Sequence, residues 1–214
     1  MKLTDINRKF SQNKYIDSEL KEVEKQCKSK HIPLIDRDAA ALLTIQLKLK
    51  KPKRVLEIGT AYGFSTLLMA KNSPQKTKIT TIELDIERAI RARDNFAKYN
   101  YSQKIDLKIG DAFDILLYLK ADYDFIFLDA AKGQYLYLFE YLFELLAPGG
   151  LLIADNVLYK GKVLKETEVN HKIRTMVINL KKYLKLVMNH PQLETTIVTA
   201  GDGMAISRRK DING

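Results

Sequence analysis

The most informative stretch of the sequence runs Glu57-Ile58-Gly59-Thr60-Ala61-Tyr62-Gly63-Phe64-Ser65. It joins an apolar, β-branched run at 54–58 to a segment whose apolar residues have helical spacing, which is typical of a strand, a turn and a helix. The two glycines permit a tight turn and a close approach of a ligand to the backbone. The spacing is E-x-G-x-x-x-G-x-S and not G-x-G-x-x-G, so the acidic residue favours a ligand with an amino or sulfonium group over a dinucleotide.

Short apolar runs alternate with helical segments beyond this stretch. The runs that predict parallel strands are 54–58, 79–83, 105–109, 125–129 and 151–155. A long basic helical stretch follows at about 170–186, and the runs 195–199 and 203–207 predict a closing hairpin. This alternation predicts an α/β fold with a doubly wound sheet.

Residues 1–50 precede the alternating pattern and contain two segments with helical spacing, 16–30 and 36–50, separated by a break at Pro33. No repeat or low-complexity linker divides the 214 residues. We therefore expect a single domain over 1–214, with 1–50 as an N-terminal helical extension.

Composition is that of a globular protein, with 46% hydrophobic and 29% charged residues, which excludes disordered and collagen-like chains. The apolar runs are far shorter than the roughly 18 residues that a membrane span needs, and the charged N-terminus is unlike a secretory signal. Cys27 is the single cysteine. We expect a cytoplasmic protein with no membrane partner. The net charge of +10 favours a polyanionic partner such as nucleic acid, although a general lysine bias explains it equally well.

Acidic residues also follow the second and third predicted strands. Glu83 ends the run 79–83, and Asp111-Ala112 come shortly after 105–109. Ligands of open α/β sheets bind beyond the carboxyl ends of the strands, where Glu83 can accept ribose hydroxyls and Asp111 falls where an adenine would lie. Singly, such acids are often helix caps, but in this order on successive strands they predict S-adenosylmethionine as the ligand.

Three oxygen-bearing side chains lie at the ends of the next two strands. Asp129 ends 125–129, and Asp155 and Asn156 end 151–155. Two carboxylates and an amide suit a hard cation, Mg²⁺ first and Ca²⁺ or Mn²⁺ next. A turn or helix cap is the alternative for Asp155 and Asn156, and the pairing with Asp129 favours the metal.

On these residues the chain resembles the cation-dependent O-methyltransferases of the catechol and caffeoyl-CoA type, from about residue 36 to the C-terminus. The resemblance implies a Rossmann-like class I methyltransferase fold, with a seven-stranded, mostly parallel sheet, an antiparallel last strand and N-terminal helices. It implies a homodimer, with S-adenosyl-L-methionine as donor. The donor-binding positions are then Ile35, Glu57, Gly59, Gly63, Ser65, Glu83, Asp111, Ala112 and Asp129. The metal ligands are Asp129, Asp155 and Asn156, and the catalytic residues are Asp129 and Lys132, with Lys132 as general base.

The implied reaction needs two neighbouring substrate oxygens on the metal, with Lys132 accepting the proton of the hydroxyl that attacks the sulfonium methyl. A catechol has such oxygens, and so does 5-hydroxyuracil. Bacterial members of the family methylate 5-hydroxyuridine at the tRNA wobble position, and Ile35-Asp36-Arg37 resembles their N-terminal region. We therefore expect the tRNA anticodon loop as partner and 5-methoxyuridine as product.

Basic and aromatic residues offer contacts for such a substrate. One basic group precedes the first strand and a second follows Asn156, where we expect it beside the mouth of the site. The first comprises Lys48, Lys50, Lys51, Lys53 and Arg54, and the second Lys160, Lys162, Lys165, Lys172 and Arg174. Candidate stacking partners for a base are Tyr62, Phe64, Tyr135 and Tyr159, with core packing as the alternative.

Two other functions stay open. One is O-methylation of a small catechol-like or CoA-linked vicinal diphenol. The other is a non-catalytic protein that binds S-adenosylmethionine or RNA, against which the intact Asp129, Lys132, Asp155 and Asn156 argue. Replacing Asp129 with Ala separates binding from catalysis.

Overall fold

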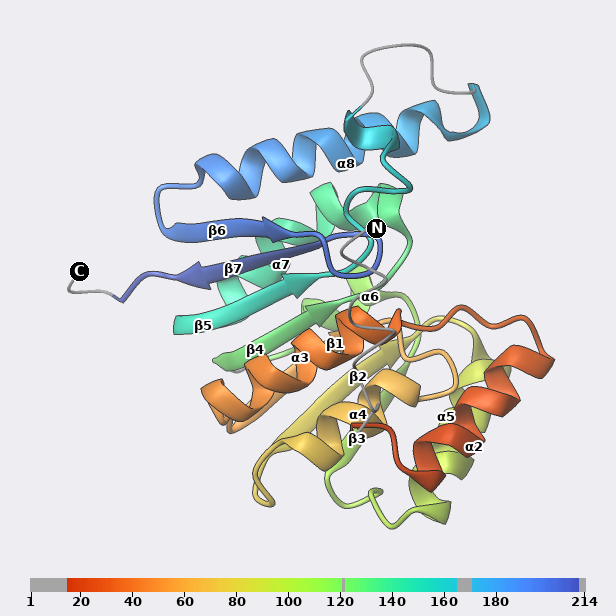
Figure 1. The fold of residues 1–214 in the computed structure, drawn as a ribbon. Coiled ribbons are helices and arrows are strands. Elements are labelled where there is room, and N and C mark those ends of the chain that lie inside the picture. Colours follow the sequence, from red (N-terminus) through yellow and green to blue (C-terminus); the bar gives the residue numbers. More distant parts are fainter. Residues whose placement is uncertain (1–14, 121, 165–170, 212–214) are drawn as a thin grey trace.

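The computed structural model describes residues 15–120, 122–164 and 171–211, which build a seven-stranded sheet with helices on both faces (Figure 1). The strand order is β3-β2-β1-β4-β5-β7-β6. The bounds are β1 Arg54–Ile58, β2 Lys78–Glu83, β3 Ile105–Ile109, β4 Tyr123–Leu128, β5 Leu146–Ala154, β6 Leu193–Val198 and β7 Met204–Arg209. β1 to β5 are parallel, and β7 is antiparallel to its neighbours β5 and β6. The predicted fold class, including the antiparallel last strand, is confirmed.

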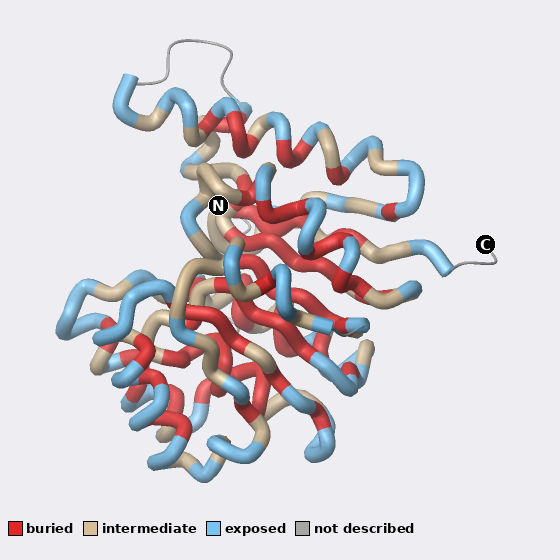
Figure 2. Tube along the Cα trace, turned by 180° about the vertical axis from the view of Figure 1, so that it is seen from behind, coloured by how far each residue is buried: buried red, intermediate tan, exposed pale blue. Residues whose placement is uncertain are grey.

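The helices form two layers around the sheet. They are α2 Ser18–Ser29, α3 Arg37–Lys50, α4 Phe64–Asn72, α5 Ile86–Lys98, α6 Ala112–Leu116, α7 Tyr135–Leu145 and α8 His171–Asn189, with 3₁₀ turns η1 Lys132–Gln134 and η2 Lys162–Leu164. α2 to α5 share one hydrophobic core, and α6 to α8 share the other (Figure 2). In β4, Phe125 and Phe127 enter the first core, while Ile126 and Leu128 enter the second. A central parallel strand is covered on both faces, which explains its continuous apolar sequence.

The N-terminal helices pack in the same core as the sheet. Leu43 and Leu47 of α3 are fully buried beside β1 and α4. Lys71 of α4 pairs with Asp17 at 2.7 Å and also with Glu19, and these contacts hold the start of α2 on α4. The described part of the extension therefore contributes a layer of the fold and not a separate appendage.

β5 begins earlier than the sequence predicts. The segment Ala147-Pro148-Gly149-Gly150 looks like a break, yet the strand starts at Leu146 because Leu146 pairs with Tyr123 across a register shift. A Cβ on Gly150 would lie 2.7 Å from the Ala147 carbonyl oxygen, so the irregular pairing requires glycine there. The shift lies at the amino end of the strands, away from the end where ligands bind, so it leaves the site unchanged.

α8 is amphipathic and runs along the outside of the sheet above β6 and β7 (Figure 1). Its inner face buries Val177, Leu180 and Leu184. Its sequence carries basic residues but no acidic one, namely Lys172, Arg174, Lys181, Lys182 and Lys185. Neither this helix nor any other within the described ranges combines the length and apolar character needed to span a bilayer.

Candidate active site

A cavity of about 450 Å³ lies at the carboxyl ends of β1 to β4. Most of the predicted site residues line it, namely Ile35, Gly59, Ser65, Glu83, Asp111, Ala112, Asp129, Lys132 and Asn156. The sequence prediction thus identified one contiguous place from residues spread over more than half of the chain. Glu57, Gly63 and Asp155 do not line it, and each has a separate structural position.

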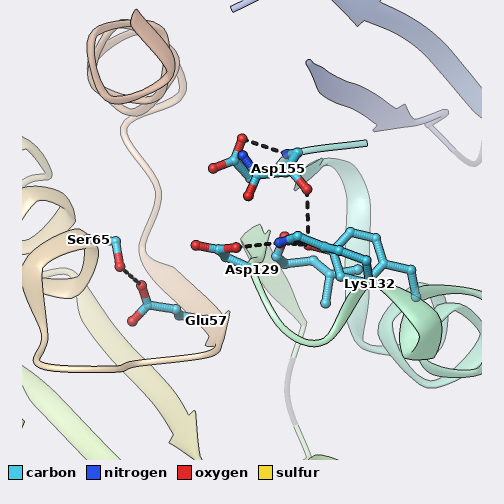
Figure 3. Close-up of polar contacts among 8 residues, drawn as sticks. Glu57, Ser65, Asp129, Lys132 and Asp155 are labelled. Atoms are coloured by element: carbon cyan, nitrogen blue, oxygen red, sulfur yellow. Dashed lines mark hydrogen bonds and ion pairs between the residues drawn. The ribbon is translucent and has the colours of Figure 1, made fainter. Parts of the chain in front are cut away.

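Glu57 lies behind the cavity wall and is fully buried. Its carboxylate accepts a hydrogen bond from Ser65 Oγ at 2.5 Å (Figure 3). It also accepts from Thr81 Oγ1 at 2.6 Å and from Thr66 Oγ1. Burial raises the pKa of Glu57 to about 7, although the three hydroxyls oppose this shift. Glu57 does not line the cavity, whereas its partner Ser65 does, so this position favours an effect of Glu57 through Ser65; the donor-binding role expected of Glu57 stays a prediction.

Two glycines shape the turn after β1. Gly59 has φ +101°, and a Cβ there would lie 2.1 Å from the Asp129 carbonyl oxygen, so glycine lets the turn touch the end of β4. Gly63 has φ +84°, and its Cβ would lie 2.4 Å from the Phe96 ring. Gly63 thus serves the packing of the turn on α5, while Gly59 serves the cavity.

The carboxylates of Glu83 and Asp111 accept hydrogen bonds from backbone N–H groups, and their oxygens can accept further bonds. Glu83 Oε2 accepts from Ala61 N at 2.7 Å, and Oε1 accepts from Asp85 N at 3.0 Å. Asp111 Oδ1 accepts from Phe113 N at 2.8 Å and caps α6, as the alternative reading of strand-end acids anticipated. A carboxylate oxygen has two lone pairs, so both residues can still accept bonds from a bound nucleoside.

Asp129 and Asp155 end neighbouring strands β4 and β5 and lie close together (Figure 3). Asp155 is fully buried, its Oδ1 accepts from Asn156 N at 2.7 Å, and its Oδ2 has no partner. Burial, and then the charge of Asp129, raise the pKa of Asp155 to about 7. A buried carboxylate oxygen without a hydrogen-bond partner, beside a second carboxylate, is a group that a divalent cation could bind.

The donor set is small and made of oxygens. The described residues contain no group of three or more His, Cys, Asp or Glu side chains placed to hold a metal ion. Two carboxylates therefore need the amide oxygen of Asn156 as a third protein ligand, and such a set leaves positions for water or substrate oxygens. These residues fit a hard divalent cation.

Lys132 stands next to this set, in η1. Its Nζ donates to Asp129 Oδ1 at 2.6 Å and to the Tyr135 hydroxyl at 2.9 Å. Tyr135 was a candidate stacking partner with core packing as the alternative, and it is fully buried, so the core-packing alternative is confirmed. A lysine and a tyrosine three residues apart on a helical turn share a face, and this spacing is the signal that could have revealed the pair.

The remaining aromatic candidates divide between wall and core. Tyr62 and Phe64 line the cavity, although Phe64 is largely buried. Tyr159 lies outside it, packed against the core and under Lys162 Nζ at 5.3 Å. Sequence reasoning missed part of the cavity wall, namely Cys27, Pro33, Leu34, Leu84, Arg88 and Gln134. These residue types carry no signal of ligand binding, because mixed apolar and polar side chains also occupy ordinary surfaces and cores.

The two basic groups lie at opposite ends of the sheet. The first lies where α3 ends and β1 begins, remote from the cavity, and Lys50 Nζ there donates to the Gly149 carbonyl oxygen at 2.8 Å. Four members of the second lie in the loop after Asn156, in η2 and at the start of α8, on the side to which β1 to β5 point (Figure 1). The fifth, Lys165, lies outside the described residues.

Comparison with known proteins agrees with this geometry. Residues 8–210 match the family model described as O-methyltransferase. A caffeoyl-CoA O-methyltransferase of Stellaria longipes is 33% identical over 178 residues, covering 80% of this chain and 74% of the relative. A catechol O-methyltransferase of Niastella koreensis is 30% identical, with 77% of each chain covered. The crystal structure of a Bacillus cereus O-methyltransferase in complex with SAH is 25% identical, covers 96% of each chain and superposes with a TM-score of 0.85. The chain therefore belongs to the O-methyltransferase family.

Proposed function

We propose that this protein transfers a methyl group from S-adenosylmethionine to a hydroxyl whose neighbouring atom carries a second oxygen, with a divalent cation holding both oxygens. The observation that carries this proposal is the buried, unpartnered Oδ2 of Asp155 beside Asp129. A buried charge without a partner is costly, so selection for stability alone would remove it. Mg²⁺ is the first candidate, and Ca²⁺ or Mn²⁺ the next.

The donor is supported by the rest of the cavity. The carboxylates of Glu83 and Asp111 keep acceptor lone pairs that suit a ribose and an adenine edge. The Bacillus cereus relative was solved with SAH, the demethylated donor. Because Asp129 and Lys132 line the same cavity as Glu83, a donor bound there would present its methyl group toward the acidic pair.

The contacts indicate a role in methyl transfer for each residue of the acidic pair and its neighbours. A bound cation would supply Lewis-acid activation of the attacking hydroxyl. Lys132 Nζ lies 2.6 Å from Asp129 Oδ1, so it stands where a proton leaves a hydroxyl held by Asp129 and Asp155. Asp129 and Asn156 then orient the substrate oxygens, and holding two reactants in line supplies much of the acceleration.

A small vicinal diphenol, free or CoA-linked, is the substrate class favoured by the names of the relatives from Niastella koreensis and Stellaria longipes. tRNA with 5-hydroxyuridine at the wobble position is the second candidate. It is favoured by the net charge of +10 and by the basic residues between the cavity and the start of α8. Single-stranded anticodon bases can enter a pocket without a large pairing cost.

Methyl transfer from labelled S-adenosylmethionine tests both candidates. The substrates are catechol, caffeoyl-CoA and tRNA that contains 5-hydroxyuridine, each with Mg²⁺ and with a chelator. Resorcinol is the matched control, because its hydroxyls are not adjacent. We expect chelator-sensitive label in a vicinal-oxygen substrate and none in resorcinol. Equal labelling of catechol and resorcinol, or label that resists the chelator, would contradict the metal-chelate proposal.

Charge reversal of single basic residues distinguishes tRNA from a free vicinal diphenol as the substrate. Arg174→Glu changes the basic group beside the cavity, and Lys51→Glu makes a change of the same size at the opposite end of the sheet. If tRNA is the substrate, Arg174→Glu raises its KM severalfold and Lys51→Glu does not, because phosphate contacts are local. If a free diphenol is the substrate, neither variant changes its KM, because it carries no phosphate. A CoA-linked diphenol does carry phosphates, so caffeoyl-CoA and tRNA are distinguished by the labelling assay. The proposed homodimer is tested separately by light scattering of the purified protein.

A further inference from the structure

The hydroxyl of Tyr135 lies where three elements meet beneath the acidic pair. It lies 2.9 Å from Lys132 Nζ in η1, 2.9 Å from the Leu128 carbonyl oxygen at the end of β4, and 3.1 Å from the Asp155 carbonyl oxygen after β5. The side chain is fully buried and no solvent reaches it. All of its hydrogen bonds are therefore made with these three groups.

The single proton of this hydroxyl decides the direction of each bond. A carbonyl oxygen can only accept, so the hydroxyl donates to Leu128 or to Asp155. Its oxygen then faces Lys132 as an acceptor, and Lys132 is the donor. Lys132 thus has two acceptors, the Tyr135 hydroxyl and the Asp129 carboxylate.

These two acceptors differ in what else they serve. Asp129 belongs to the proposed cation site, so a bound cation competes with Lys132 for its carboxylate oxygens. The Tyr135 hydroxyl is buried beneath the strand ends, is bonded to two backbone carbonyl oxygens and is no part of the proposed cation site. We propose that Tyr135 is a positioning residue. Its hydroxyl keeps the Lys132 amine beside Asp129 and Asp155 when the Asp129 carboxylate binds the cation. This inference rests on the proposed function.

The surroundings of Tyr135 make its hydroxyl separable from its ring. The ring packs edge-on against Tyr183 at 5.5 Å between centroids, and Lys132 Nζ lies 5.2 Å from the ring centroid. Asn179 of α8 also holds η1, by donating to the Gly133 carbonyl oxygen at 3.2 Å. Tyr135→Phe keeps the ring contacts and η1, and removes the hydroxyl alone.

The same core provides a matched control. Tyr183 is also fully buried, touches the Tyr135 ring and has no hydrogen-bond partner for its hydroxyl. Tyr183→Phe therefore deletes a hydroxyl of equal burial that holds nothing. We expect Tyr135→Phe to lower kcat about tenfold, with the KM of donor and acceptor changed less than twofold, and Tyr183→Phe to leave both unchanged.

A double-mutant cycle shows whether Tyr135 acts through Lys132. Lys132→Met removes the amine and keeps a stem of similar length over the Tyr135 ring. If the hydroxyl acts through the amine, Tyr135→Phe costs nothing further in the Lys132→Met background. An equal tenfold cost in both backgrounds would overturn the proposal and assign the hydroxyl to the strand-end carbonyls alone.

A second readout does not need turnover. Acetic anhydride acetylates accessible amines, and peptide mass spectrometry gives the rate at Lys132 relative to exposed lysines. With Mg²⁺ present, we expect Tyr135→Phe to acetylate severalfold faster at Lys132 than the unmodified protein, and Tyr183→Phe to match the unmodified protein. An unchanged Lys132 rate in Tyr135→Phe overturns the inference, whatever the outcome of the methyl-transfer assays. Failure of every methyl acceptor, with the rate difference intact, counts against the proposed function alone.

Discussion

At the residue scale, burial raises the pKa of two carboxylates, Glu57 and Asp155, to about 7, but their hydrogen-bond partners differ. Glu57 is enclosed by three hydroxyl donors, so its burial is compensated inside the protein. Asp155 has one backbone donor and a free oxygen, and Asp129 adds a like charge beside it. Glu57 is thus a structural acid, while Asp155 needs something that the protein alone does not supply.

Neutralising Asp155 should therefore separate stability from function. Above pH ~7, where Asp155 is ionised, Asp155→Asn removes an uncompensated charge with little change in shape, so we expect the metal-free variant to be as stable there as the unmodified protein or more so. Thermal unfolding with and without Mg²⁺ measures this: a cation at 100 times its Kd adds about 2.7 kcal/mol to the unmodified protein and nothing to the variant. Methyl transfer should fall at least about 100-fold. Asp114→Asn is the control, because Asp114 is an exposed residue of α6. If Mg²⁺ still stabilised Asp155→Asn, the assignment of Asp155 as a metal ligand would be contradicted.

The pH dependence of the metal-free protein follows from the same two acids. The folded pKa of each is about 7, above the ordinary values of 4.5 for Glu57 and 3.8 for Asp155, so the folded state binds their protons more tightly. Between pH ~4 and ~7 the unfolded chain has released these protons and the folded chain has not, so stability falls as pH rises, by about 1.4 kcal/mol per pH unit for each group. Urea unfolding in chelator checks this, and Asp155→Asn should lose its share of the slope. Stability that rises over this range would refute it.

Sequence reasoning identified these residues by type and order, but could not assign every partner. Glu57 looks like a ligand contact because it precedes a glycine turn, and only the fold shows Ser65, Thr66 and Thr81 closing around it. For Tyr135 the sequence leaves base stacking and core packing open, because one sequence does not show which side of η1 faces the core. Both differences arise from tertiary contacts between segments that local pattern does not relate.

At the element scale, the turn between β6 and β7 supports the segment that follows Asn156. Asp202 accepts from Lys160 N through both carboxylate oxygens, at 2.6 and 2.8 Å. The backbones also join, through Val157 N to the Gly203 carbonyl oxygen at 2.9 Å. The closing hairpin thus orients a predicted metal ligand that lies far from it in the sequence.

Asp202→Ala should weaken metal binding without touching the donor. Among the described residues the Asp202 carboxylate accepts hydrogen bonds from the backbone N–H of Lys160, and second-sphere changes of this kind typically cost 10- to 100-fold in metal affinity. Calorimetric titration with Mg²⁺ and with S-adenosylhomocysteine measures the two affinities separately. A parallel loss of both would mean that Asp202 holds the fold in general and not this segment.

The turn after β1 gives a second test at this scale. Gly59→Ala places a Cβ 2.1 Å from the Asp129 carbonyl oxygen at positive φ, so β1 and β4 must separate. Overpacking and backbone strain each cost about 1–3 kcal/mol, and activity should fall because Asp129 moves. Gly161→Ala is the control: it has φ +72° but no atom within 4 Å of its Cβ, so the strain acts alone. Equal losses of stability in both would contradict the close-contact explanation.

Most helices and strands could be predicted from the sequence, because the spacing of apolar residues follows the buried face of each element. The strand 54–58 and the strand 105–109 coincide with β1 and β3, and the helix expected at 36–50 is α3 within one residue. The start of β5 could not be predicted, since Pro148 and Gly149 carry turn signals that an irregular pairing overrides.

At the scale of the whole molecule, the cavity joins distant parts of the chain. Cys27, Pro33 and Ile35 form its wall from the N-terminal side, while the sheet ends form its floor. The ion pair of Lys98 with Glu22 and the contacts of Lys71 fix α2 on α4 and α5 from outside. A chain segment remote in sequence from the strand ends therefore completes the site.

Binding of S-adenosylhomocysteine should consequently slow amide hydrogen exchange in α2 and in residues 30–36. A ligand that touches this wall binds only when the wall is closed, so it suppresses local opening. Exchange followed by mass spectrometry measures the effect, with α8 as an internal control outside the cavity. Exchange in α2 that the ligand does not change would show that the wall is no part of the donor site.

Asp129 belongs to both halves of this site: its side chain faces Asp155 and Lys132, and its carbonyl oxygen touches the turn at Gly59. Donor and cation would therefore both depend on the position of Asp129. Binding of either one would fix that position for the other. Thermodynamic linkage then requires reciprocity: the factor by which the cation tightens the donor equals the factor by which the donor tightens the cation. A cell low in one ligand would then hold a protein with lowered affinity for the other, so the response to either concentration would depend on the concentration of both.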